Sequence, residues 1–249
     1  MALDAALLAA AVAAGPAALP TLRLYQWRRP TLSLGYHQRQ LPPRWRPALE
    51  RGAVELVRRP SGGRAVLHAG ELTYALIWPQ APERRSEAYR LACQWLQAAF
   101  AVMGQPLSFG AQAASAERSS CFATSTAADL VHADGGKRIG SAQLWRSGCL
   151  LQHGSILLAP PSPLWRELFD HDPPPLAELP LAGAALMALL RRCAEHHWLA
   201  LGGRALELRP LGPAERAAIR TGRQHYRVPA GAGEGWGVTS PAATMPRAT

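Results

Sequence analysis

The alternation of apolar and polar side chains predicts a series of short strands in the first third of the chain. Residues 21–27 (TLRLYQW) and 31–37 (TLSLGYH) alternate in this way, and the Arg-Arg-Pro sequence between them is typical of a turn. Two more short apolar runs lie within residues 53–68, on either side of Pro-Ser-Gly-Gly, and residues 71–78 (ELTYALIW) form another candidate strand.

Apolar residues at helical spacing predict four helices, at residues 1–14, 84–104, 182–201 and 213–226. Stretches rich in proline or in small polar residues predict loops at residues 41–47, 110–120 and 171–180. Residues 128–158 predict a hairpin that turns at Asp134-Gly135-Gly136, followed by a further strand pair.

Many short strands and a few long helices favour the α+β fold class. We therefore expect residues 1–228 to form a single domain, with a mixed, largely antiparallel sheet packed by helices. Residues 229–249 are rich in Gly, Ala and Pro, a composition typical of a disordered tail.

The first stretch of the chain, MALDAALLAAAVAAGPAALP, is apolar and needs to be distinguished from a signal peptide. No basic residue precedes it, Asp4 interrupts it and Ala dominates rather than Leu, so we predict an ordinary helix that ends at Gly15-Pro16. No other stretch resembles a membrane segment. The expected protein is cytoplasmic, soluble and without a membrane partner.

Composition indicates the class of protein and the compartment that fit this chain. Hydrophobic residues make up 48% of the 249 residues, which is enough for a substantial core, and the four cysteines show no CxxC spacing. That pattern argues against a disulfide scaffold or a metal site and favours a reducing compartment. The net charge of +10 indicates either a base-rich surface or attraction to an acidic partner. No nucleic-acid-binding motif accompanies it, and an acidic protein partner is equally compatible with the charge.

Lys137 is the only lysine among 27 basic residues. Since Arg supplies every other positive side chain, a position that retains Lys suggests a need for a compact ammonium rather than a planar guanidinium. Chance survival of one surface lysine is the alternative. Small residues follow it in Gly136-Lys137-Arg138-Ile139-Gly140-Ser141-Ala142-Gln143, so a bound group could lie along an open backbone groove.

Two other segments hold candidate binding residues. Adjacent glycines in residues 58–68 (RRPSGGRAVLH) allow a ligand to approach the main chain, and the flanking Arg side chains add donors, although a plain turn would use the same residues. In residues 151–157 (LQHGSIL), His153 is either a hydrogen-bonding wall residue or a satisfied core histidine. The candidates are Arg59, Ser61, Gly62, Gly63, Arg64, Ala65, His68, Gly140, Ser141, Ala142, His153 and Gly154.

Cys121 differs from the other cysteines because it lies in a polar loop. Cys93, Cys149 and Cys193 lie in apolar, regular segments, where a buried and inert thiol is expected. Cys121 precedes Lys137 by sixteen residues, and a nearby ammonium would favour its nucleophilic thiolate.

Together these motifs resemble the superfamily of lipoate-protein ligases, octanoyltransferases and biotin ligases. RRPSGGRAVLH followed by GELTY resembles the acyl-binding loop and next strand of its lipoate branch, GKRIGSAQ resembles the catalytic-lysine motif, and QHGSILL resembles the strand that follows. The resemblance runs from about residue 3 to about residue 226 and implies the biotin/lipoate protein ligase fold.

Two chemistries occur in the lipoate branch. The ligases activate lipoate with ATP and need no cysteine, whereas LipM-like octanoyltransferases have a nucleophilic Cys in an Ala-Cys-Phe segment shortly before the lysine motif. Ser120-Cys121-Phe122 resembles that segment, which favours the transferase. The chain departs from the pattern after Phe122, at Arg138, where an apolar residue is common, and in a longer hairpin before Lys137.

The resemblance implies catalytic roles for Cys121 and Lys137 in octanoyl transfer. The donor would be octanoyl-acyl carrier protein, and the acceptor a lysine of glycine-cleavage H protein or of a lipoyl domain of a 2-oxoacid dehydrogenase. A monomer without metal or cofactor would suffice. The alternatives are an ATP- and Mg²⁺-dependent lipoate-protein ligase and a non-catalytic lipoyl-domain binding module.

Overall fold

A computed structural model describes residues 1–110, 122, 129–201 and 203–228. Its larger sheet has six antiparallel strands in the order β1-β5-β9-β8-β7-β6. These are β1 (Thr21–Tyr25), β5 (Glu71–Trp78), β9 (Cys149–Leu157), β8 (Lys137–Arg146), β7 (Asp129–Val131) and β6 (Ser108–Phe109). The smaller sheet has the order β3-β2-β4, with β2 (Thr31–Leu34) parallel to β3 (Glu55–Arg58) and antiparallel to β4 (Val66–His68).

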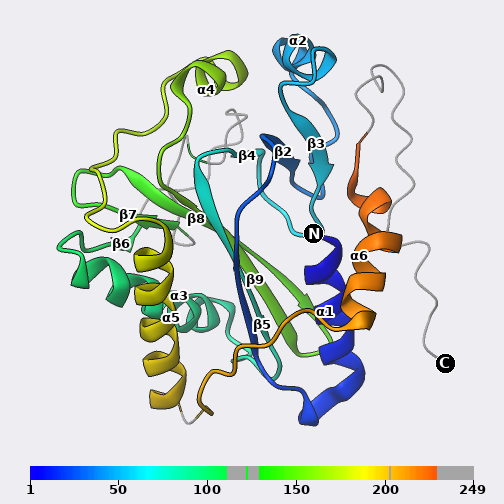
Figure 1. Cartoon of the computed structure of the whole chain (residues 1–249), viewed down its shortest axis with the longest axis vertical. Helices are drawn as coiled ribbons and strands as arrows, with labels where there is room; N and C mark the ends of the chain where they lie inside the picture. Colours follow the sequence, from blue (N-terminus) through cyan, green and yellow to red (C-terminus); the bar gives the residue numbers. More distant parts are fainter. Residues whose placement is uncertain (111–121, 123–128, 202, 229–249) are drawn as a thin grey trace.

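Helices cover both faces of the larger sheet (Figure 1). Helices α3 (Arg85–Val102) and α5 (Gly183–Ala200) pack on one face, and α1 (Ala2–Ala14) packs on the other with α6 (Pro213–Tyr226) beside it. The smaller sheet packs against the 3-10 helices and short helices near it: η2 (Pro43–Trp45), α2 (Arg46–Glu50) and α4 (Ser162–Phe169). A short 3-10 turn, η1 (Gly15–Ala17), ends α1.

Strand β5 shows how the sequence divides these layers. Leu72, Tyr74 and Leu76 point into the core with α3 and α5, because alternate side chains of a strand leave on opposite faces. Ala75 and Ile77 point to the other face and pack under α1. Thr73 lies on that same face nearer the start of the strand, away from the α1 contacts, and lines a pocket.

These observations confirm the α+β class and most of the predicted elements. The helices predicted at 1–14, 84–104, 182–201 and 213–226 are α1, α3, α5 and α6, and residues 128–158 contain the predicted hairpin and strand pair as β7, β8 and β9. Among the described residues, no helix is long and apolar enough to cross a membrane. The predicted tail at 229–249 and most of the 110–120 loop lie outside the described residues.

Two expectations needed correction, and one short helix was not predicted. Residues 21–27 and 31–37 do form strands, but β1 and β2 end at Tyr25 and Leu34 and belong to different sheets. Residues 41–47 are not a plain loop: η2 and the start of α2 lie there, because proline is compatible with the first turn of a helix. The same tolerance explains α4, which starts at Ser162 with a proline at its next position and was not predicted.

Arg138 is fully buried, which gives a role to one departure from the family pattern. Its guanidinium donates to the carbonyl oxygens of Leu157 (3.0 Å) and Ala177 (2.5 Å) and to Nε2 of His132 (2.9 Å). Burial lowers the pKa of Arg138 to about 10. The side chain thus ties the proline-rich connector around Ala177 to the inner strands β8 and β9 of the larger sheet.

Candidate functional site

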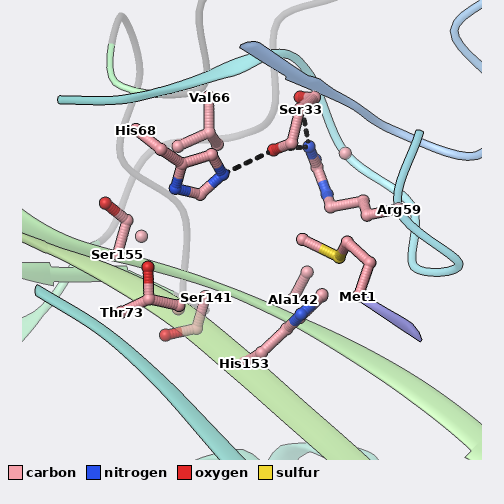
Figure 2. A pocket seen from close by; sticks show the side chains of 13 residues that line it. Met1, Ser33, Arg59, Val66, His68, Thr73, Ser141, Ala142, His153 and Ser155 are labelled. Atoms are coloured by element: carbon pink, nitrogen blue, oxygen red, sulfur yellow. Dashed lines mark hydrogen bonds between the residues drawn. The ribbon is translucent and has the colours of Figure 1, made fainter. Parts of the chain in front are cut away.

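A pocket lies where the two sheets meet (Figure 2). Ser33, Arg59, Val66 and His68 line it from the side of the smaller sheet, and Thr73, Ser141, Ala142, His153 and Ser155 face them from the larger sheet. Met1, Gly63, Gly140 and Gly154 complete the lining. The empty volume is about 430 Å³, including its open mouth.

Lys137 is placed beside this pocket by an irregularity between β7 and β8. Asp129 pairs with Gly140 and Leu130 with Ile139, but Val131 pairs with Lys137, so one residue of β8 is extra. Strict alternation would put Lys137 and Gly140 on opposite faces of the strand. A bulge shifts that alternation and re-aims side chains, so the amine of Lys137 reaches the Gly140 side.

Asp129 holds the ammonium of Lys137. Nζ lies 2.9 Å from Oδ2, and both side chains are only 4% exposed. The ion pair therefore fixes a buried cation in place beside Gly140, which lines the pocket.

Phe122 packs on the other side of the same ammonium. Nζ of Lys137 lies 5.0 Å from the centroid of the Phe122 ring, within the range of a cation–π contact. A Cβ at Gly140 would meet Cζ of Phe122 at 3.3 Å and Cε of Lys137 at 3.1 Å, so glycine is what lets these two side chains approach the strand. Cys121 precedes Phe122 in the chain and lies outside the described residues.

The glycine-containing loop is held by Arg59 and by a close backbone contact. The Arg59 guanidinium donates to the carbonyl oxygens of Ser33 (2.8 Å), Gly62 (2.9 Å) and Arg64 (2.6 Å). Gly63 has a φ of +94°, which favours glycine, and a Cβ at Gly35 would lie 1.7 Å from the Gly63 carbonyl oxygen. Arg59 is therefore a scaffold of the loop as well as a wall of the pocket.

His153 crosses the gap between the two sheets as a neutral side chain. Its Nε2 is hydrogen-bonded to the hydroxyl of Ser61, and the ring is 5% exposed. Burial, with the nearby Arg59 charge opposing protonation as well, lowers the pKa of His153 to about 3. Both interpretations of this residue are partly right, since it lines the pocket and is also a satisfied, buried histidine.

His68 makes the second crossing, and here the partner is a carboxylate. Nδ1 of His68 lies 2.8 Å from Oε1 of Glu71, and Nε2 lies 2.8 Å from the hydroxyl of Ser33. Glu71 also accepts hydrogen bonds from Thr73 (2.6 Å) and Ser155. The indole ring of Trp27 stacks on the imidazole with centroids 4.3 Å apart.

The structure thus brings eight of the twelve predicted binding residues to one cavity: Arg59, Gly63, His68, Gly140, Ser141, Ala142, His153 and Gly154. The other four do not line it. Ser61 supports His153, the carbonyls of Gly62 and Arg64 hold Arg59, and Ala65 is buried in the core of the smaller sheet.

The sequence analysis missed the polar residues that surround these side chains. Ser33, Glu71 and Thr73 lie at alternate positions of predicted strands, and all three are buried. A signal was present, because Glu71 and Thr73 share one face of a strand that follows the glycine motif directly. Asp129 gave no such signal, since its partner Lys137 is reached only through the bulge.

Of the described cysteines, none lines the pocket. Cys93 and Cys149 are buried, and burial raises the pKa of Cys93 to about 12, which leaves it an unreactive thiol. Cys193, on α5, is half-buried. Within the described part of the chain, His, Cys, Asp and Glu form no group of three that could hold a metal ion.

Comparison with known proteins identifies the family. Residues 1–169 match the lipoyl protein ligase A/B catalytic domain. An octanoyltransferase LipM of Kyrpidia tusciae is 37% identical over 213 residues, covering 81% of this chain and 71% of that one. An octanoyltransferase LipM of Exiguobacterium sp. is 38% identical over 152 residues, but the match spans only 55% of that relative's length and 56% of this chain.

A solved structure supports the same assignment at the level of fold. The crystal structure of lipoate-protein ligase A bound with ATP superposes with a TM-score of 0.69 at 18% identity, over 88% of this chain and 86% of the other. The chain therefore belongs to the family of lipoyl protein ligase A/B catalytic domains.

Proposed function

We propose that this protein transfers an octanoyl group from octanoyl-acyl carrier protein to a lysine of a lipoyl-accepting protein, through an acyl-enzyme on Cys121. The observation that carries the proposal is the position of Phe122, the chain neighbour of Cys121, against the ammonium of Lys137. The relatives named octanoyltransferase LipM support the same reaction. Residues 1–228 are proposed to form the catalytic domain.

In the first step, the Cys121 thiolate attacks the carbonyl carbon of the donor thioester. A new C–S bond forms, and the carrier protein's sulfur leaves as a thiolate that takes up a proton. Lys137, held by Asp129, supplies the positive charge that favours the Cys121 thiolate and donates a hydrogen bond to the acyl oxygen. Glycines at 63, 140 and 154 let the acyl chain lie against backbone in the pocket.

The partners proposed are acidic proteins, namely acyl carrier protein and acceptors such as glycine-cleavage H protein or lipoyl domains. The net charge of +10 would steer both toward the enzyme. The reaction needs no metal or nucleotide, since the thioester donor is already activated. We assign it to the cytoplasm, in keeping with the scarcity of cysteine.

Intact-mass analysis tests this function. After incubation with octanoyl-acyl carrier protein and no ATP, we expect a mass gain of one octanoyl group, located on Cys121 by peptide mapping. Cys121→Ser should abolish transfer to the acceptor, whereas Cys193→Ser, a matched change on α5, should leave it intact. Loading of free lipoate that requires ATP and Mg²⁺ and survives Cys121→Ser would instead identify a ligase.

A further inference from the structure

Transfer to the acceptor needs a base, which the first step does not. The attacking group is a lysine side chain, which is an ammonium at neutral pH and must lose a proton before it can attack. Lys137 cannot take that proton, because its amine is itself a cation bound to Asp129. Among the described side chains that line the pocket, the remaining bases are the imidazoles of His68 and His153. The N-terminal amine of Met1, which also lines it, forms an ion pair with Asp4.

His153 is unsuited to the task. Its pKa of about 3 means that the imidazole stays neutral and does not accept a second proton at neutral pH. Its Nε2 is hydrogen-bonded to the hydroxyl of Ser61, a residue that does not line the pocket. Its hydrogen-bond partner is a neutral hydroxyl, and burial outweighs the nearby Asp4 carboxylate, which would favour the imidazolium.

His68 has the opposite surroundings. Glu71 receives hydrogen bonds from Thr73, Ser155 and His68, so it is an ionised acceptor and Nδ1 of His68 carries the hydrogen. Nε2 then accepts a hydrogen bond from the hydroxyl of Ser33. The Ser33 oxygen in turn accepts a hydrogen bond from Nη1 of Arg59 at 3.2 Å. Figure 2 shows the Ser33–His68 hydrogen bond at the edge of the cavity.

We propose that Ser33, His68 and Glu71 form a proton relay that deprotonates the acceptor lysine. Ser33 would contact the amine, and His68, oriented by Glu71 and stacked on Trp27, would receive the proton through the Ser33 hydroxyl. This inference rests on the proposed octanoyl transfer and adds the groups that make its second step possible.

Bonds and protons balance in that second step. One ammonium proton passes to the Ser33 oxygen while the Ser33 hydroxyl proton passes to Nε2 of His68. The neutral amine attacks the acyl carbonyl carbon, a C–N bond forms, and the C–S bond to Cys121 breaks with its electron pair on sulfur. The second amine proton goes to that sulfur, and the His68 imidazolium, stabilised by Glu71, later returns its proton to water.

Several charged or titratable groups face His68 and bear on the pH dependence of this step. They are Glu71 on β5, Arg59 across Ser33, and His153 on β9, while Trp27 covers one ring face. Burial keeps the pKa of His153 near 3, so its imidazole stays neutral and its charge does not change near pH 7.

The test compares two acceptors on preloaded acyl-enzyme. Wild type and His68→Gln are loaded with octanoate, desalted and mixed either with an acceptor protein or with hydroxylamine, an amine that is already neutral at pH 7. With the lysine acceptor, His68→Gln should react on the order of 100-fold more slowly. With hydroxylamine the two proteins should react at similar rates, because no base is needed. His196→Gln, an exposed change on α5, is the matched control.

A second readout and a second variant keep the relay testable. In His68→Gln the lysine rate should rise about tenfold per pH unit, following the free amine, whereas the wild-type rate should level off. Ser33→Ala, a smaller change, should show the same selective loss if His68→Gln does not fold. An equal loss with both acceptors, or no loss with lysine, would overturn the relay. Failure of the wild type to load Cys121 would instead overturn the proposed function.

Discussion

The two walls of the pocket are built by different means. The larger sheet contributes side chains whose direction follows from strand alternation, such as Thr73 and Ser155, and a bulge brings Lys137 beside the pocket. The wall from the smaller sheet depends on backbone, since Arg59 is bonded to carbonyl oxygens and Gly35 must approach Gly63 closely. The larger sheet thus bears the buried Lys137–Asp129 ion pair beside the pocket, whereas the wall from the smaller sheet bears Arg59 and mainly sets the shape.

Two hydrogen bonds join these walls, and the group that each histidine meets differs in charge. His68 meets the carboxylate of Glu71, whereas His153 meets the neutral hydroxyl of Ser61. A carboxylate stabilises an imidazolium and a hydroxyl does not, so the same side chain is suited to proton transfer in one place and to fixed structure in the other. Changes on each wall should therefore have separable effects.

The largest expected effect comes from removing the charge partner on the larger sheet. Asp129→Ala leaves the buried Lys137 ammonium without its carboxylate and should cost about 3–5 kcal/mol of unfolding free energy, measured by urea denaturation. Adding Lys137→Met should restore much of that loss, because the unpaired charge is gone. Asp172→Ala, which removes an exposed ion pair with Arg166, should change stability by less than about 1 kcal/mol. Equal losses of unfolding free energy for Asp129→Ala and Asp172→Ala would contradict a stabilising role for the buried Lys137–Asp129 pair.

A smaller effect should appear in the pH dependence of folding. His153 has a pKa of about 3 in the folded protein and about 6.5 when unfolded, so below pH 6.5 the unfolded chain binds a proton that the folded chain does not. Its contribution is full above pH 6.5 and is lost as pH falls toward 3. Between pH 6.5 and 4.5, wild type should lose about 2–3 kcal/mol more than His153→Gln. Parallel stability curves would mean that His153 is not held neutral.

The sequence predicted individual residues of this site but not the contacts between them. Lys137, Gly140 and His153 could be found because a rare residue type and short motifs marked them, and strand β5 was predicted to the residue. The links among them could not be predicted. Whether Ser33 faces solvent or His68 depends on how the smaller sheet packs on the larger one, and no local pattern records that packing.

On the wall from the smaller sheet, only some of the structurally required glycines could be predicted from the sequence. The sequence drew attention to Gly62 and Gly63 because they are adjacent, but nothing local pointed to Gly35, which meets Gly63 only when β2 lies beside the loop. Local sequence identifies a residue that needs an unusual φ. It does not identify a residue that needs a missing side chain because a distant backbone passes close to it.

The smallest expected effect tests that backbone contact. A Cβ at Gly35 would collide with the Gly63 carbonyl, so Gly35→Ala should shift the loop, cost about 1–3 kcal/mol and slow octanoyl loading. A Cβ at Gly62 would meet nothing within 4 Å and its φ is not positive, so Gly62→Ala is the matched control, with stability unchanged or raised by about 0.4–1 kcal/mol. Thermal unfolding and loading rates would separate the two variants. Similar behaviour of both would show that this wall tolerates backbone shifts and that its shape does not depend on the Gly35–Gly63 approach.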